Sequence, residues 1–358
     1  MVIPNSKRIL FLFLIFFISF SIPLQAHENY QFTTYTQENG LVSGTIRGIK
    51  KDLTGYIWLL SENGLTRFDG YTFKKFQHIP SDSSSIPSMD VRNLFQSGEG
   101  EILFQTSNGF CKYVPSRSGF KKIISFTSRD EYVGALGSDN GFWIIKSTGL
   151  IYLNSKDELS KEYKFPSSYK ARALHLSLVC ENKIWLSDGD SMLCFNPATK
   201  QFSFKHLVGI STEQREELSI YHLFSQNGKI PCFYSSQGLF KYSVKQDAYE
   251  FFSKSNLQIE KNNPVDGAFF TGNYLIFSLR FNQLFCIQIF TGEEHWIDLS
   301  KSSNSHSSNI QISSFDKINE NEVWVSTSTQ GIFKVNIQTN KISQIYNDVS
   351  NRFSLPSN

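Results

Sequence analysis

The feature that most constrains this chain is a unit of about 45 residues that recurs seven times along the sequence. In each unit one strand-like segment is followed within a few residues by a second that opens on Gly, Ser or Gln. The openings are Gly64, Gly109, Gly149, Ser191, Gly238, Gln283 and Gly331, and they step by 45, 40, 42, 47, 45 and 48 residues. A period of this length is typical of repeat architectures.

Each unit contains four short segments, which is the pattern of a four-stranded antiparallel meander. In the first unit they read TIRGIK, YIWLLS, GLTRFD and TFKKFQ, and each is near the usual strand length. A lone meander would expose an apolar face and two edges, whereas seven packed radially bury the faces against one another. The sequence therefore predicts an all-β fold, a seven-bladed β-propeller of four-stranded antiparallel blades. A solenoid or a β-sandwich agrees less well with four strands in every unit.

Turn and packing residues fill the repeated positions, where Gly supplies a positive φ and Trp is expected to fill the gap between neighbouring sheets. The motif residues are Asp52, Gly55, Trp58, Gly64, Asp69, Gly70, Gly109, Trp143, Gly149, Trp185, Gly238, Trp324 and Gly331. The predicted equivalents of Trp58 are Leu103, Trp143, Trp185, Cys232 or Pro231, Phe277 and Trp324. Residues 212–224 are the best helical candidate, although this segment is short and polar at its start.

Two ways of closing the ring are open. In the first, residues 31–36 form the outer strand of the last blade, and residues 341–346 begin something further along. In the second, residues 341–346 complete their own blade, and residues 31–36 cover an edge.

The N-terminus has the pattern of a secretory signal peptide, residues 1–26, with cleavage after Ala26. Lys7 and Arg8 precede an apolar run, residues 9–20, that is shorter than the roughly 20 residues of a membrane span; an uncleaved anchor is the alternative. Removing the two cations lowers the net charge from +3 to about +1, which gives no electrostatic case for nucleic acid. We therefore expect a periplasmic chain, with the propeller in residues 27–346 and a linker in residues 347–358.

No motif for a metal, a cofactor or catalysis stands out. The seven His lack metal-site spacing, and Asp188-Gly-Asp190 fits a hairpin turn better than a calcium loop. The five Cys lie in strand-like segments and are interpreted as core hydrophobes. The segment TGEEHW, residues 291–296, resembles the docking motif of quinoprotein dehydrogenase propellers, but it occurs once and predicts only a hairpin. We expect no catalytic residue, no metal and no cofactor.

Residues 38–80 resemble the N-terminal blade of the two-component regulator propeller repeats. The resemblance is carried by Gly40, Leu41, Asp52, Gly55, Ile57, Trp58, Gly64, Leu65, Asp69, Gly70 and Phe73. It implies the periplasmic sensor of a Bacteroidota hybrid two-component system, which senses an oligosaccharide and signals to a histidine kinase. The kinase would lie outside this chain, which would then be truncated, split or a fragment. A homodimer and an inner-membrane anchor in the full-length relative are also implied.

Two other functions remain open from the residues alone, a glycan lyase or hydrolase and a plain protein-interaction propeller. An enzyme would need acid and base groups facing one side of the channel, and no clustered Glu/Asp pair recurs on equivalent loops. Tyr132, Tyr169 and Tyr221 are aromatic loop residues that could stack on sugar rings. The sequence assigns no ligand-binding residue.

Overall fold

The computed structural model describes residues 46–69, 72–127, 131–169, 171, 173, 176–226, 228–253, 265–271, 274–279, 282–288, 293–301, 310–327 and 332–345. All of them belong to one of the two units into which the chain divides, residues 34–358. The expected signal peptide, the segment 31–36 and the expected linker 347–358 lie outside the described residues.

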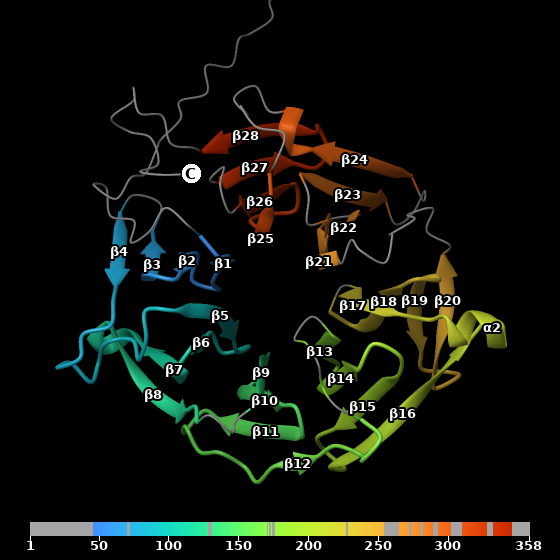
Figure 1. The fold of residues 1–358 in the computed structure, drawn as a ribbon, viewed down its shortest axis with the longest axis horizontal. Helices are drawn as coiled ribbons and strands as arrows, with labels where there is room; N and C mark the ends of the chain where they lie inside the picture. Colours follow the sequence, from blue (N-terminus) through green and yellow to red (C-terminus); the bar gives the residue numbers. More distant parts are fainter. Residues whose placement is uncertain are drawn as a thin grey trace, which may run out of the picture. The chain divides into compact units, whose positions relative to one another are not determined.

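The regular secondary structure of the described residues is almost entirely β-strand (Figure 1). Its first half contains β1 (Gly48–Lys51), β2 (Ile57–Ser61), β3 (Gly64–Phe68), β4 (Phe73–Phe76), β5 (Val91–Gln96), β6 (Ile102–Thr106), β7 (Gly109–Val114), β8 (Gly119–Ser125), β9 (Tyr132–Ser138), β10 (Gly141–Lys146), β11 (Gly149–Asn154) and β12 (Tyr163–Lys164). Its second half contains β13 (Ser177–Cys180), β14 (Lys183–Ser187), β15 (Met192–Asn196), β16 (Gln201–Val208), β17 (Ile220–Gln226), β18 (Ile230–Ser235), β19 (Gly238–Ser243), β20 (Ala248–Ser253), β21 (Val265–Thr271), β22 (Tyr274–Leu279), β23 (Gln283–Gln288), β24 (Glu294–Asp298), β25 (Ile312–Lys317), β26 (Glu322–Thr327), β27 (Ile332–Asn336) and β28 (Lys341–Ile345).

These strands form meanders of four, each antiparallel and in chain order. Five are separate four-stranded sheets, and two, β13–β16 and β17–β20, join into one eight-stranded sheet through a parallel pairing of β16 with β20. We number them meander 1 (β1–β4) to meander 7 (β25–β28). The meanders follow one another around a ring with their first strands innermost (Figure 1). The all-β propeller predicted from the repeat is confirmed as the fold.

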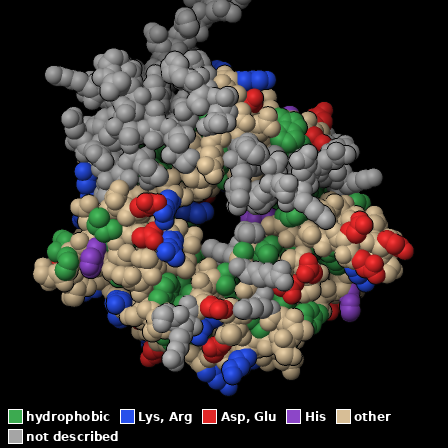
Figure 2. All heavy atoms as spheres, viewed as in Figure 1, with side chains coloured by type: hydrophobic (Ala, Val, Ile, Leu, Met, Phe, Trp, Pro, Cys, Tyr) green, Lys and Arg blue, Asp and Glu red, His purple; other side chains and the backbone are tan. Residues whose placement is uncertain are grey.

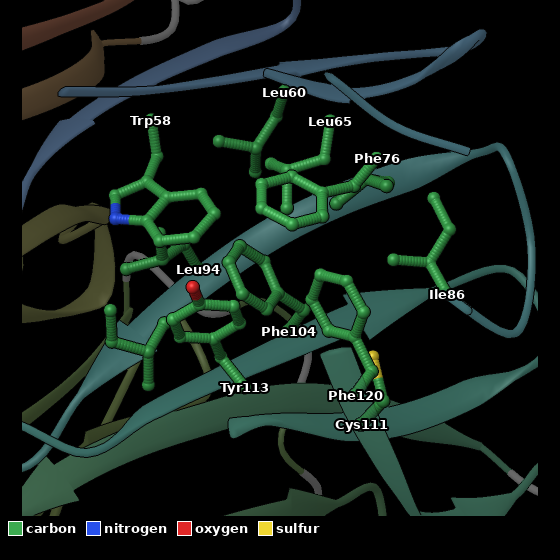
Figure 3. Close-up of a cluster of buried hydrophobic side chains, with 12 residues drawn as sticks. Trp58, Leu60, Leu65, Phe76, Ile86, Leu94, Phe104, Cys111, Tyr113 and Phe120 are labelled. Carbon is green, nitrogen blue, oxygen red and sulfur yellow. The ribbon is translucent and has the colours of Figure 1, made fainter. Parts of the chain in front are cut away.

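The core lies between neighbouring meanders, not at the centre of the ring. A separate cluster of buried hydrophobic side chains fills each interface, and one of these joins meander 7 to meander 1. Between meanders 1 and 2, Trp58 packs edge-on against Phe104 and Tyr113, with ring centroids 5.2 and 5.1 Å away (Figure 3). Each such interface is what a meander needs in order to bury its apolar face.

One predicted packing residue was wrong by one position. Phe277 packs against Tyr234 of the preceding meander, meander 5, with ring centroids 4.8 Å apart. Its neighbour Ile276 lies in the cluster shared with meander 7, as the equivalent of Trp58 should. Because side chains alternate across a strand, a slip of one residue moves a position to the opposite face. The segment YLIFSL lacks Trp and Gly, so the sequence did not fix its register.

The ring closes through contacts between the first and last meanders. Ile46, Ile49 and Leu59 share a buried cluster with Ile332. The strand β28 pairs with β27 and completes its own meander. The second way of closing the ring is therefore the observed one for residues 341–345, and the first was wrong about them.

The helical candidate at 212–224 is a helix only at its start. The helix α2 (Thr212–Glu216) begins with a reciprocal capping box between Ser211 and Gln214, and β17 starts at Ile220. The described elements also include two short 3₁₀ turns, η1 (Pro115–Arg117) and η3 (Leu299–Lys301). Among the described residues, no helix has the length and apolar character to cross a membrane.

Candidate ligand-binding face

The ring has two rims around its centre. At the upper rim the innermost strands begin, as at Val91 and Ile220, and the turns between second and third strands lie nearby. At the lower rim the innermost strands end and turn back into the second strands, as at Lys51 and Ser138. The two rims differ in what their residues do.

The lower rim of meander 1 is organised by the buried carboxylate of Asp52. Its Oδ2 accepts a hydrogen bond of 2.7 Å from Trp58 Nε1, and its Oδ1 accepts from the backbone N–H groups of Thr54 and Tyr56 and from the Thr54 hydroxyl. Gly55 completes the turn with a φ of +93°, which glycine adopts without strain. Both carboxylate oxygens of Asp52 are thus engaged in holding the turn and the indole.

Hydrogen bonds between neighbouring turns link the lower rim. Gly98 and Glu99 of meander 2 donate their backbone N–H groups to the carbonyls of Ser138 and Asp139 in meander 3, at 2.9 and 3.2 Å. Lys51 donates its backbone N–H to Asp316 Oδ2 of meander 7 at 3.2 Å. These bonds join backbone to backbone or to a fixed carboxylate, so the lower rim is an architectural surface.

A partly buried ion cluster joins meanders 2 and 3 at the lower side. Lys112 Nζ lies 2.5 Å from Glu101 and 2.8 Å from Asp157, which also accepts from Lys121 at 2.6 Å. Burial alone would raise the pKa of the Asp157 carboxyl, but hydrogen bonds from Lys112 and Lys121 outweigh it and hold that pKa below its usual range. Burial alone would likewise lower the pKa of Lys112, yet its hydrogen bonds to Asp157 and Glu101 raise it.

The upper rim is marked by a recurring irregularity in the innermost strands. In five of them the ladder skips the second residue of the strand, which produces a β-bulge. The skipped residues are Arg92, Val133, Tyr221, Asp266 and Ser313. Arg47 holds the matching place in meander 1, just before β1. Bulges redirect side chains and are common beside active sites, so Arg92 and Tyr221 are candidates for ligand contact. The Ser313 hydroxyl instead donates to the Ile46 carbonyl of meander 1 at 3.0 Å.

Charged side chains gather at the upper rim over meanders 1 and 2. Asp90 Oδ1 accepts from Arg47 Nη1 at 2.8 Å, and Asp90 Oδ2 accepts from Arg92 Nε and Nη2 at 3.1 and 3.0 Å. Arg47 also pairs with Glu62. Figure 2 shows Lys or Arg and Asp or Glu side chains side by side here, next to a hollow at the centre of the ring. We call Glu62, Arg47, Asp90 and Arg92 the arginine chain.

Two of the three candidate tyrosines lie at the upper rim and one does not. Tyr132 and Tyr221 are half-buried on β9 and β17. Tyr132 stacks on Phe126 with ring centroids 4.8 Å apart, and Lys146 Nζ lies 5.5 Å from its ring centre. Tyr169 is buried beside Phe165 in the core between meanders 3 and 4 and cannot stack on a ligand.

The remaining motif residues lie in turns and interfaces. Trp143 and Trp185 are buried, whereas Trp324 is half-buried and donates from Nε1 to Glu322 at 2.7 Å. Gly64, Gly109 and Gly238 have positive φ, and a Cβ on Gly109 would come within 1.9 Å of the Ile124 carbonyl oxygen. Gly149 begins β11, and Asp69 accepts from Thr72 in a turn. Gly70 and Gly331 lie outside the described residues.

The residues considered for metal binding or reactive chemistry have structural surroundings in the described ranges. Asp188 Oδ1 accepts from the backbone N–H groups of Asp190 and Ser191, so this segment is a turn as predicted. The described ranges bring together no group of three His, Cys, Asp or Glu side chains. All five cysteines are buried and unpaired, and burial raises the pKa of the Cys111 thiol to about 12. Trp296 of the TGEEHW segment is exposed.

Comparison with known proteins finds the same fold in proteins of different kinds. No family model matches the chain. Histidine kinase P4 of Formosa agariphila is 36% identical over 70 residues, which are 20% of this chain and 5% of that protein. The extracellular domain of a putative hybrid two component system from B. thetaiotaomicron superposes with a TM-score of 0.59 at 17% identity, over 83% of this chain and 40% of that one. This chain therefore spans less than half the length of either relative.

The resemblance predicted from residues 38–80 is confirmed at the level of fold, because the extracellular domain of a hybrid two-component system has the same architecture. The same architecture also occurs in an enzyme. Virginiamycin B lyase from Staphylococcus aureus superposes with a TM-score of 0.58 at 12% identity, over 80% of this chain and 92% of that one. At these identities the likeness concerns the fold alone.

Proposed function

We propose that this chain is the extracytoplasmic ligand-sensing propeller of a hybrid two-component regulator, which binds an oligosaccharide and signals to a histidine kinase outside this chain. The observation that carries the proposal is the 36% identity over 70 residues to a histidine kinase, in a chain whose fold matches the extracellular domain of a hybrid two-component system. Export to the periplasm by residues 1–26 and assembly as a homodimer are parts of the same proposal.

The upper rim is the binding site in this proposal. It combines half-buried aromatic rings, Tyr132 and Tyr221, with the donors and acceptors of the arginine chain. Sugars present apolar ring faces and a dense set of hydroxyls that both donate and accept, so their sites combine aromatic surfaces with a few fixed polar groups. The lower rim lacks free acceptors of this kind at Asp52, because its carboxylate already holds the turn and the indole.

A glycan array probed with the purified full chain tests the proposal, followed by calorimetry on the oligosaccharides that bind. We expect saturable binding of a defined oligosaccharide, and loss of binding in Tyr221→Ala with little change for Lys122→Ala on the outer strand β8. Absence of binding to every oligosaccharide class on the array would contradict the sensor proposal.

A propeller enzyme is the second candidate, since a lyase is covered almost completely by this fold. The two functions differ in what happens to the bound sugar. Incubating the chain with each bound oligosaccharide and separating the products by chromatography decides between them. A sensor returns the ligand intact, and an enzyme shortens it or releases unsaturated products.

A further inference from the structure

We propose that the arginine chain selects sugars that carry an anionic group, a carboxylate or a sulfate ester, through Arg47 and Arg92. This inference rests on the proposed function and concerns the same rim. It is carried by two guanidinium groups that converge on one carboxylate at the rim of a central hollow.

The two guanidinium groups are held in place by hydrogen bonds to the Asp90 carboxylate. The Asp90 backbone N–H donates to the Ser88 hydroxyl at 3.2 Å, and its carbonyl accepts from Ser107 N–H at 3.0 Å. With its backbone fixed on both sides, Asp90 offers one oxygen to Arg47 and the other to Arg92. The arginines belong to different meanders, so Asp90 brings together two cations that the chain separates by 45 positions.

Arg92 keeps donor capacity for a ligand. Its Nε and Nη2 face Asp90, while its Nη1 makes no hydrogen bond to any described residue, and its side chain is 52% exposed. A guanidinium is a planar fork of donors that matches an oxyanion, and it stays charged at every accessible pH. Anchored on one edge, Arg92 presents its other edge without the loss of side-chain freedom that a mobile cation would suffer on binding.

Arg47 is held on its other side by a carboxylate that a ligand can replace. Glu62 is 56% exposed and Arg47 40% exposed, and ion pairs between exposed side chains are weak. Asp90, at 28%, is the less exposed partner. An anionic sugar group would therefore take the place of Glu62 on Arg47 and reach Arg92, while Asp90 remains as the holder of both.

Side chains near the arginine chain could contact the uncharged part of a sugar. Asn93 follows the bulge at Arg92 and donates from Nδ2 to Gln105 Oε1 at 2.9 Å. The ring of Tyr132 lies on the next innermost strand, half-buried. Amides can bind hydroxyls and an aromatic face can pack against a sugar ring, so these neighbours favour a saccharide over a bare inorganic anion.

The test compares ligands that differ only in charge, using the full chain. A uronic acid trisaccharide, its carboxyl-reduced neutral counterpart, a sulfated form of the neutral trisaccharide and inorganic sulfate are titrated by calorimetry. We expect the acidic or the sulfated trisaccharide to bind at least about tenfold more tightly than the neutral one, and the comparison of these two arms names the anion. Inorganic sulfate should bind far more weakly.

Variants distinguish specific binding of the anion by the two guanidinium groups from a general effect of charge. Arg92→Lys keeps the charge and loses the fork, and it should weaken anionic binding about tenfold while changing neutral binding less than twofold. Glu62→Gln removes the competing carboxylate and should tighten anionic binding about threefold, a gain that a structural role would not produce. Glu99→Gln, on the lower rim, is the matched charge control and should change neither.

Equal binding of charged and neutral trisaccharides would overturn the inference and leave the sensor function standing. Sulfate binding as tightly as the sugars would overturn the saccharide part of it. Failure of all three trisaccharides to bind would overturn the inference, and the proposed function would be contradicted only if the glycan array also showed no binding.

Discussion

The two rims of this ring are built from the same strands but in different ways. The lower rim is held by hydrogen bonds that engage backbone groups and the buried carboxylate of Asp52. The upper rim is formed by bulged residues that differ from one meander to the next, such as the exposed Arg92 and the half-buried Tyr221. The difference teaches that one set of sheets presents a rim of fixed turns and a rim whose innermost-strand residues vary, and the candidate site lies on the variable one.

The largest expected loss of stability is at the interface between the first two meanders. Replacing the fully buried Trp58 by Ala opens a cavity among Phe104 and Tyr113 and should lower the free energy of unfolding by about 3–5 kcal/mol, measured by urea denaturation. The control is Trp296→Ala, an exposed Trp that should lose less than about 1 kcal/mol. Similar losses for both would remove the distinction between interface and surface tryptophans.

A smaller loss of stability is expected when Asp52 is replaced by a residue of the same shape that no longer accepts the indole hydrogen bond. Asp52→Asn can turn an amide N–H towards the indole N–H of Trp58, which leaves a buried donor unpaired and should destabilise the fold by about 1–3 kcal/mol. Thermal unfolding measures the change. Asp139→Asn alters an exposed turn carboxylate at the same rim and should leave stability unchanged; a loss as large as that of Asp52→Asn would show that Asp52 has no special place.

The ion cluster between meanders 2 and 3 gives a pH-dependent prediction. Asp157→Asn should lower the free energy of unfolding by about 1–2 kcal/mol at pH 7, because the carboxylate bonded to Lys112 and Lys121 is lost. The folded-state pKa of Asp157 is lowered, so its contribution is present above the unfolded value of about 3.9 and disappears as pH falls through the lower folded value. Urea denaturation from pH 7 to pH 3 should show wild type and variant converging in acid. A difference that grows in acid would contradict the assignment.

The smallest effect on stability is expected at the upper rim. Arg47→Ala removes exposed ion pairs and should change the free energy of unfolding by less than about 1 kcal/mol, while weakening oligosaccharide binding measured by calorimetry. Lys50→Ala, an exposed cation towards the other end of the same innermost strand, is its control and should leave binding intact. A stability loss as large as that of Trp58→Ala would mean that the two rims do not differ in role.

Sequence reasoning reached the lower-rim turn of meander 1 through its motif residues. The stretch from Asp52 to Trp58 carries motif residues of the propeller repeats that it resembles, and the position of Trp58 recurs at Trp143, Trp185 and Trp324. The slip from Ile276 to Phe277 arose where that pattern is absent. The parallel pairing of β16 with β20 had no signal, because it depends on how two outer strands meet in space.

The upper rim could not be assembled from the sequence. Arg47 and Arg92 are one period apart, and nothing in their neighbourhood shows that Asp90 joins them. The bulges that place Arg92 and Tyr221 appear only as a register shift in the ladder. Tyr169 has an aromatic ring that could stack on a ligand, but it lies in the core between meanders 3 and 4 because the connection that carries it folds inward.

The measurement that tests this account most directly is hydrogen–deuterium exchange of the full chain with and without the oligosaccharide that binds best. We predict slower exchange on binding in the upper-rim segments 46–48, 90–93, 132–134 and 220–222, and unchanged exchange in the lower-rim segments 51–56, 97–101 and 138–141. Protection confined to the lower rim would contradict the assignment of ligand binding to the bulged end of the innermost strands.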